Sequence, residues 1–224
     1  IASNIGGSQL IGGMDEDAVR RLIDAIEADI IIVHLNPLQE LMQPEGDRCF
    51  EGIADGLADL VRKAPVPVWV KETGAGISGE VGRRLLELGV SGIDVSGAGG
   101  TSWARVENRR ENQSSPDHAF DNWGIPTVTC IQALHQIENR SSFSLIGSGG
   151  IRSSFDIAKA MCLGADFTAT ATPVIKAISN GGYEEFEQLY LKWREQLEKI
   201  LLLLGCSSPA ELQEFHLIPG GGKS

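Results

Sequence analysis

The segment FSLIGSGGIRSSFDIAKAMCLGADFTATAT, residues 143–172, decides the fold. The short apolar run Phe143–Gly147 predicts a strand, and a glycine-rich turn leads from it into a helix. Ser153 or Ser154 is a suitable N-cap for this helix, and Gly164 a suitable end. A second strand is predicted at Phe167–Thr172. Two strands joined by a helix through short turns indicate a parallel sheet.

The same alternation of strands and helices continues along almost the whole chain. Apolar residues at helical spacing predict helices over Asp17–Ile26, from Ser78 to Gly89, and over Tyr183–Leu204. Glu87–Val95 and Cys162–Thr170 form a faint internal repeat, in which a helix ends on a glycine and a strand begins. The six predicted strands are Ile1–Ile5, Ile30–Leu35, Val66–Lys71, Gly92–Ser96, Phe143–Gly147 and Phe167–Thr172.

The residues that follow the strands distinguish between two folds that contain a parallel sheet. An open doubly wound sheet concentrates its site at one switch point, whereas a (β/α)8 barrel spreads it over the C-terminal ends of many strands. We therefore predict an α/β protein with one (β/α)8 TIM-barrel domain over residues 1–224, with six of the eight βα units visible. The glycine and polar stretches behind this choice are Asn4–Gly7, His34–Asn36, Lys71–Glu72, Gly97–Thr101 and Gly147–Gly150.

The composition excludes several classes of protein. The net charge of −11 is spread along the chain, which argues against a nucleic-acid or anionic-membrane surface, since both need clustered Lys and Arg. No apolar run approaches the roughly 20 residues of a membrane helix. The four cysteines lie far apart without Cys/His ligand spacing, so we expect reduced thiols in a cytoplasmic protein and no disulfide framework or zinc site.

Two glycine-rich stretches are candidate ligand sites. In Gly147–Ser154 the glycines let the backbone approach a ligand, and the start of the following helix offers N–H groups to an anion. The next strand ends at Ala171 and Thr172, and loops after the seventh and eighth strands form the usual phosphate site of barrels. A tight turn without a ligand is the alternative. The stretch Gly97–Thr101 predicts that the backbone lies close to a flat or bulky group.

Charged and polar side chains follow two further strands. Lys71 ends an apolar strand, so it needs an anion or an electron-rich ring, or else a partner such as Glu72 or Asp94. A second stretch, residues 34–47, places a histidine, amides and carboxylates in a loop, and carboxylate oxygens with few histidines suit Mg²⁺. Taken singly, each residue of this second stretch is more typical of a turn or a solvated surface. Together, at the end of a strand, they are better explained as a site.

The motifs HLNPLQE…QPEGD, VKE, GAGGTSW and SGGIR followed by DIAKAMCLGAD occur in this order. In them the chain resembles type 2 isopentenyl-diphosphate isomerases over essentially its whole length. The resemblance implies a (β/α)8 barrel that binds FMN and Mg²⁺, uses NADPH to reduce the flavin, and interconverts isopentenyl and dimethylallyl diphosphate. It also implies a cytoplasmic homo-oligomer, a tetramer or octamer, with a small diphosphate substrate and no nucleic-acid or membrane partner.

The same resemblance assigns roles to individual residues. Asn4, Lys71 and Thr101 would contact FMN, and Gly149, Gly150, Ala171 and Thr172 would hold its phosphate. Gln39 would touch the substrate, His34 and Asn36 would line the same mouth, and Glu40 would hold Mg²⁺. Relative to the family pattern the chain is N-terminally incomplete, because Ile1 falls at the third strand.

Two alternatives to the isomerase remain open at this point. One is an FMN barrel oxidoreductase of the 2-hydroxy-acid oxidase kind, which would need a histidine base and an arginine for the carboxylate. Only His118 and His135, both displaced from the expected place, could supply the base. The other is an inactive fragment that retains pieces of a flavin site.

Overall fold

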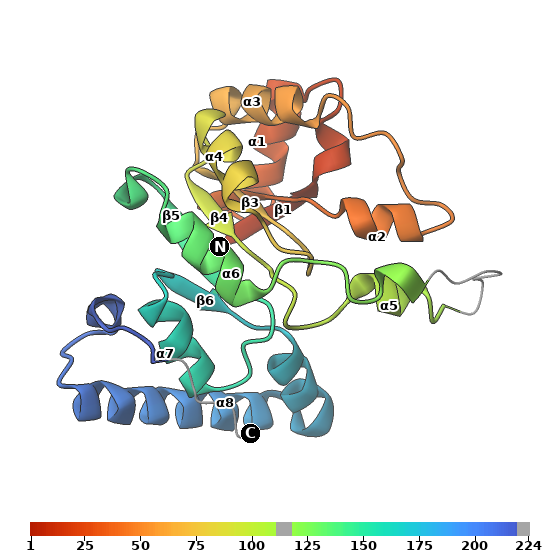
Figure 1. The fold of residues 1–224 in the computed structure, drawn as a ribbon. Coiled ribbons are helices and arrows are strands. Elements are labelled where there is room, and N and C mark those ends of the chain that lie inside the picture. Colours follow the sequence, from red (N-terminus) through yellow and green to blue (C-terminus); the bar gives the residue numbers. More distant parts are fainter. Residues whose placement is uncertain (111–117, 219–224) are drawn as a thin grey trace.

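The computed structural model describes residues 1–110 and 118–218 and contains one parallel sheet. Neighbours in the chain are neighbours in the sheet, without the reversal of strand order that marks an open doubly wound fold (Figure 1). The sheet is therefore an arc of a barrel. Its strands, in order, are β1 (Ala2–Gly6), β2 (Ile30–His34), β3 (Val68–Lys71), β4 (Gly92–Asp94), β5 (Ser144–Ser148) and β6 (Phe167–Ala169).

Every strand leads into helical structure, as predicted. Figure 1 shows α1, α3 and α4 grouped on one part of the sheet, with α7 and α8 beside β6. The helices are α1 (Glu16–Asp24), α2 (Pro37–Met42), α3 (Ile53–Lys63), α4 (Gly79–Glu87), α5 (Trp103–Glu107), α6 (Thr127–His135), α7 (Ser154–Cys162) and α8 (Thr172–Leu204). Short 3-10 turns are η1 (Gly7–Leu10), η2 (His118–Phe120), η3 (Arg140–Ser142) and η4 (Pro209–Glu214).

Local signals explain where the helices begin. The side chain of Asp15 accepts a hydrogen bond from the Ala18 N–H at the start of α1, and Ser78 and Ser153 cap α4 and α7 in the same way. Gly89 and Gly164 follow α4 and α7 with left-handed φ values of 89° and 107°. Ser78, Ser153, Gly89 and Gly164 confirm the predicted caps and glycine ends, whereas the cap at Asp15 was not predicted.

One predicted boundary near the end of the chain was wrong. The sixth strand ends at Ala169 and not at Thr172, because Thr172 begins α8 with a proline directly after it. Gly181 and Gly182 have non-helical dihedrals, so the predicted helix Tyr183–Leu204 is confirmed as the second part of α8. The short helix over residues 172–180, which forms the first part, was not predicted. The fourth strand is also shorter than predicted and ends at Asp94.

The two faces of the sheet differ in character. Val33, Val70, Ile93 and Leu145 are partners in register across β2 to β5, and each is 0% exposed beneath the outer helices. Burying each such side chain contributes roughly 1.5–3 kcal/mol to folding. The opposite face, which we call the lumen face, carries His34, Lys71 and Asp94 at the strand ends. The rings of Trp69 and Phe167 also lie on this face, with centroids 6.4 Å apart.

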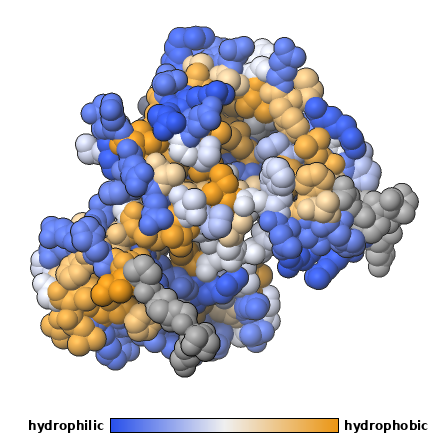
Figure 2. Space-filling view, in the orientation of Figure 1, coloured by the Kyte–Doolittle hydropathy of each residue, from blue (hydrophilic) through white to orange (hydrophobic). Residues whose placement is uncertain are grey.

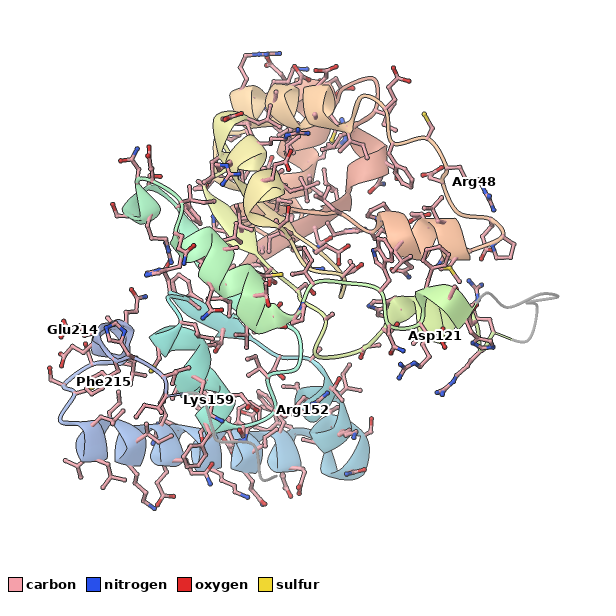
Figure 3. The ribbon with its side chains drawn as sticks, viewed as in Figure 1. Arg48, Asp121, Arg152, Lys159, Glu214 and Phe215 are labelled. Atoms are coloured by element: carbon pink, nitrogen blue, oxygen red, sulfur yellow. The ribbon has the colours of Figure 1, made fainter. Side chains whose placement is uncertain are left out.

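The surface mixes hydrophilic and apolar side chains (Figure 2). Arg48 and Lys159 are exposed and lie on separate parts of the ribbon (Figure 3). Apolar side chains gather near the end of α8 (Figure 2), where Leu202 and Leu203 are 80% and 85% exposed. Among the helices within residues 1–110 and 118–218, none combines the length and apolar character needed to cross a bilayer.

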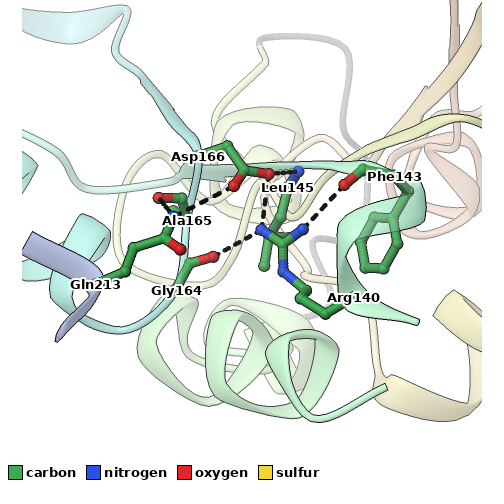
Figure 4. A network of polar contacts seen from close by, with 7 residues as sticks. All are labelled: Arg140, Phe143, Leu145, Gly164, Ala165, Asp166 and Gln213. Atoms are coloured by element: carbon green, nitrogen blue, oxygen red, sulfur yellow. Dashed lines mark hydrogen bonds and ion pairs between the residues drawn. The ribbon is translucent and has the colours of Figure 1, made fainter. Parts of the chain in front are cut away.

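A polar network fastens the N-terminal ends of β5 and β6 (Figure 4). Arg140 donates to the carbonyl oxygens of Phe143 at 2.9 Å and Gly164 at 2.7 Å, and pairs with the Asp166 carboxylate at 2.7 Å. Gln213, on η4, donates to the other oxygen of Asp166 at 3.2 Å. This network holds three loops together at the end of the strands opposite to the one that carries the polar row.

Candidate functional site

A cavity of about 590 Å³ lies at the C-terminal ends of the strands. It receives side chains or backbone from β2 to β6 and from the loops that follow them. The predicted residues that line it are His34, Gln39, Lys71, Thr101, Gly149, Gly150, Ala171 and Thr172. Asn4, Asn36 and Glu40 do not line it, although each is hydrogen-bonded within the surrounding loops and strands.

His34, Lys71 and Asp94 form a row across the floor of the cavity, because they are partners in register on β2, β3 and β4. The Nδ1 atom of His34 lies 2.6 Å from the Asn4 Oδ1 atom, so Asn4 is placed behind the histidine. Burial, and then the charge of Lys71, hold the pKa of His34 below its ordinary value. Near neutral pH the histidine is therefore uncharged.

Lys71 is the positive charge of this row. Its ammonium group donates to the Glu72 carbonyl oxygen at 2.9 Å and forms no ion pair within the described residues. Burial lowers the pKa of Lys71, and Asp94 and Glu72 oppose this effect. The alternative of a lysine in close pairing with one of these carboxylates is thus not what the structure contains.

Asp94 is a site residue that the sequence reasoning weighed only as a partner for Lys71. Its Oδ1 atom accepts hydrogen bonds from the Ser148 hydroxyl and, at 3.2 Å, from the Ser96 N–H. Burial raises the pKa of Asp94, while these two donors and Lys71 favour the charged form. The sequence feature that could have identified Asp94 as a site residue is its position as a carboxylate at the end of an apolar strand.

The two glycine-rich loops lie against each other. Gly149 and Gly150 have left-handed φ values of 95° and 87°, and a Cβ atom on either would overlap a carbonyl oxygen of Gly97 or Gly99. The Thr127 hydroxyl donates to the Gly149 carbonyl oxygen at 2.7 Å and fixes this packing. The result is a wall of closely packed backbone, the glycine wall, with no room for side chains between the two loops.

The start of α8 lies at the cavity, since its N-cap Ala171 and first residue Thr172 line it, and no side chain caps this start. The start of α7 is capped by Ser153 and is not among the described residues that line the cavity. The N–H groups and the helix dipole at the start of α8 favour an anion. An anion at the start of α7 stays a prediction.

Arg152 adds a positive charge near the glycine wall. It lies just before α7 (Figure 3), lines the cavity, and donates to the Gly99 carbonyl oxygen at 3.0 Å. The Thr170 hydroxyl donates to the Ile151 carbonyl oxygen at 2.6 Å, which joins the loop after β5 to the loop after β6.

At the other side of the cavity, the loop after β2 carries the remaining predicted residues. The Gln39 amide donates to the Glu107 carboxylate at 3.3 Å, and Gln43 donates to the same oxygen at 2.8 Å. Glu107 is 3% exposed. Burial opposes its ionisation, but hydrogen bonds from Arg110, Gln43 and Gln39 keep the pKa of Glu107 below its ordinary value. Sequence reasoning missed this residue, since nothing local to α5 distinguishes it.

Glu40 is oriented by its own loop. One carboxylate oxygen accepts from the Asn36 amide at 2.6 Å and the other from the Asp47 N–H at 2.9 Å. Within residues 1–110 and 118–218, no group of three or more His, Cys, Asp or Glu side chains is arranged to hold a metal ion. The donor chemistry at Glu40 therefore fits only an ion that takes one carboxylate from the protein and other oxygens elsewhere.

The cavity as a whole fits a flat cofactor that carries a phosphate. Backbone of Gly97, Gly100, Gly149 and Gly150 lines one side of the cavity without side chains, Lys71 stands on the floor, and the uncapped start of α8 offers N–H groups to an anion. FMN combines a planar ring with a terminal phosphate, so these residues match its shape and charge.

Comparison with known proteins agrees with this geometry. Residues 42–219 match the family described as FMN-dependent dehydrogenase. Proteins named isopentenyl-diphosphate delta-isomerase from Chlorobium limicola and Stutzerimonas stutzeri are 43% and 42% identical, each over 97% of this chain. The chain spans 63% of the length of each of these relatives.

Solved structures with the same fold are more distant in sequence. A mandelate oxidase R163L variant with 2-hydroxy-phenylacetamide has a TM-score of 0.60 and 20% identity, over 91% of this chain and 60% of that one. Mandelate oxidase with benzoyl-formic acid gives the same values. Together with the strand order, these structures confirm the TIM-barrel fold class. The chain belongs to the FMN-dependent dehydrogenase family.

Proposed function

We propose that this chain provides the FMN site and part of the substrate site of an isopentenyl-diphosphate isomerase that works with reduced FMN and Mg²⁺. One observation carries the proposal: a single cavity joins Lys71, the glycine wall and the open start of α8 with Gln39. The names of the relatives that are 42% and 43% identical support the choice of reaction.

The residues of the chain would hold FMN as follows. Lys71 and Thr101 would contact the ring system, and Asn4 would orient His34 through their hydrogen bond. The phosphate would bind at the N–H groups of the glycine loop and at the start of α8. The bound flavin would supply a ring that can give and take a proton next to the substrate.

The substrate would lie between the flavin site and the loop after β2. Isomerisation removes a proton from one carbon and adds one to another, so no electrons are gained or lost overall. The Gln39 side chain would face this substrate, and Glu107 would hold its amide in one orientation through the 3.3 Å hydrogen bond. Orientation of this kind lowers the barrier by placing the reacting groups in advance.

Glu40 would hold Mg²⁺ against the diphosphate. Asn36 and the Asp47 N–H orient its carboxylate, and Mg²⁺ commonly binds through one carboxylate together with substrate phosphates. The resemblance alone supports the remaining parts of the proposal, which are reduction of the flavin by NADPH and a cytoplasmic homo-oligomer without nucleic-acid or membrane partners.

The hydroxy-acid oxidase alternative finds little support in the site. Its candidate base His118 is 66% exposed and lies next to Asp121, while His135 ends α6 beside Gly164. Neither histidine lines the cavity. The likeness to mandelate oxidase extends to the fold, at 20% identity.

The test is turnover by the purified chain with dithionite-reduced FMN and Mg²⁺. We expect conversion of isopentenyl diphosphate to dimethylallyl diphosphate, detected by acid lability of the allylic product, and no oxidation of 2-hydroxy acids. Product from a hydroxy acid alone would overturn the proposal in favour of the oxidase. A chain that neither retains a flavin absorbance band nor turns over either substrate would indicate an inactive fragment.

A further inference from the structure

The floor of the cavity contains a carboxylate that the proposed reaction does not use. Asp94 and Lys71 are partners in register on β3 and β4, so their side chains rise from the same face of the sheet. Neighbouring strands are about 4.8 Å apart. The two groups are therefore close enough to interact through their charges, although they form no ion pair.

Asp94 is held in one place. Its Oδ1 atom accepts from the hydroxyl of Ser148 on β5 and from the Ser96 N–H at 3.2 Å. Hydrogen bonds donated to a carboxylate stabilise its charged form. The structure thus provides donors on two elements for a carboxylate that burial alone would neutralise.

The other titratable and charged groups around Lys71 are less well placed to favour its protonated form. His34, on β2, is neutral near neutral pH, and Arg152, after β5, is itself positive. Glu72 follows Lys71 on β3, but its carboxylate accepts the N–H groups of Thr73 and Ala75. Asp94 therefore has the larger opposing effect on the pKa of Lys71.

We propose that Asp94 is a positioning residue that acts through Lys71: its fixed carboxylate keeps the lysine protonated on the cavity floor, so that a positive charge faces the bound flavin. This inference rests on the proposed FMN site for its consequence. Its first step, the protonation of Lys71, can be measured without any flavin.

The first experiment measures the protonation of Lys71 directly. Trace acetylation of the flavin-free chain with acetic anhydride, followed by peptide mass spectrometry, reports the unprotonated fraction of each lysine as pH is varied. Asp94→Asn should raise the acetylation rate of Lys71 severalfold near neutral pH, because the variant loses the charge that favours the ammonium form. Asp24→Asn, an equal change on the exposed side of α1, should leave the rate unchanged. An unchanged rate in Asp94→Asn overturns the proposal.

The second experiment measures FMN affinity by quenching of flavin fluorescence as pH is raised from neutral. Asp94→Asn should lose affinity at a lower pH than the native chain, because burial lowers the pKa of Lys71 and the variant lacks the carboxylate that opposes this effect. Lys71→Met should bind weakly at every pH, and adding Asp94→Asn to it should cause no further loss.

The outcomes separate this inference from the proposed function. Affinity that falls equally at every pH in Asp94→Asn would mean that Asp94 acts by direct contact or through the fold, and would overturn the inference. If Lys71 acetylation responds to Asp94→Asn but the native chain binds no FMN, the proposed function fails while the link between the two residues stands. Should Asp94→Asn be unfolded by circular dichroism, Asp94→Ser, which retains a hydrogen-bonding group for Ser148, serves in both experiments.

Discussion

Among single residues, Gly149 carries two constraints at once: a left-handed backbone and no room for a Cβ atom. Gly149→Ala should cost about 1–2 kcal/mol from the backbone strain and about 1–3 kcal/mol more from the clash with Gly97, and it should weaken FMN binding. Gly12→Ala is the matched control, since Gly12 has φ 86° with nothing within 4 Å of its Cβ position. Urea denaturation and FMN titration of both variants check this. Equal losses in the two would contradict our description of the wall.

Glu40 and Lys71 are expected to fail in opposite ways. Glu40→Gln should lower kcat/KM by roughly 30- to 150-fold, about 2–3 kcal/mol, while FMN remains bound, because a hard cation prefers an ionised oxygen. Lys71→Ala should instead release FMN. Glu45→Gln is a control in the same loop, since Glu45 is 61% exposed and pairs with Arg110. Loss of flavin from Glu40→Gln, with flavin retained in Lys71→Ala, would show that the two sites are wrongly placed.

His34 should make the stability of the chain depend on pH. Its pKa is lowered in the folded chain from the ordinary value of 6.5, first by burial and then by Lys71. The unfolded chain therefore binds the proton more readily, and the stability due to neutral His34 is complete above pH 6.5 and decreases as pH falls below it. We expect the free-energy difference between the native chain and His34→Gln to shrink on acidification, as measured by urea denaturation. A difference that stays constant with pH would contradict this.

At the scale of helices, we expect the start of α7 to contribute to stability and the start of α8 to bind the anion. Ser153→Ala should lower stability by about 1 kcal/mol through loss of the α7 cap, without changing FMN affinity. Ser78→Ala, at the equivalent cap of α4, should cost a similar amount. Thermal unfolding and FMN titration measure both effects. If Ser153→Ala weakened FMN binding and Ser78→Ala did not, the anion would bind at α7 and not at α8.

The short first part of α8 is set apart by its glycines. Gly182 has φ 66°, so the chain breaks the helix there and the segment 172–180 stands as a separate element at the cavity. In barrels the phosphate site is frequently completed by the N-terminus of a short extra helix, and this segment occupies that place.

For the molecule as a whole, we expect residues at the N-terminal ends of the strands to affect stability and residues at the C-terminal ends to affect FMN binding. The Arg140–Asp166 network lies at the N-terminal ends, away from the cavity. Asp166→Asn should reduce the free energy of unfolding by about 1.5–3 kcal/mol, the range for hydrogen bonds to charged groups. FMN affinity, measured below the unfolding transition, should not change. A matching loss of FMN affinity would contradict the separation.

Much of the fold could be predicted because its signals are local. The period of apolar residues, the Ser and Asp caps and the glycines after helices depend on the geometry of a few consecutive residues. For the same reason the glycine loops and Lys71 could be identified as candidates. The short helix over residues 172–180 and the early end of β6 were missed, because apolar and small residues there fit a strand as well as a helix.

The sequence by itself determined the order of strands and helices and the chemical type of the residues at the strand ends. Only the tertiary structure decided which of those residues meet. Register across β3 and β4 pairs Lys71 with Asp94, and the fold brings Gln39 to Glu107, 68 positions away in the chain. The fold also places the start of α8, and not that of α7, at the cavity. Such contacts depend on how separate strands align and pack, which the periodicity of any one segment does not encode.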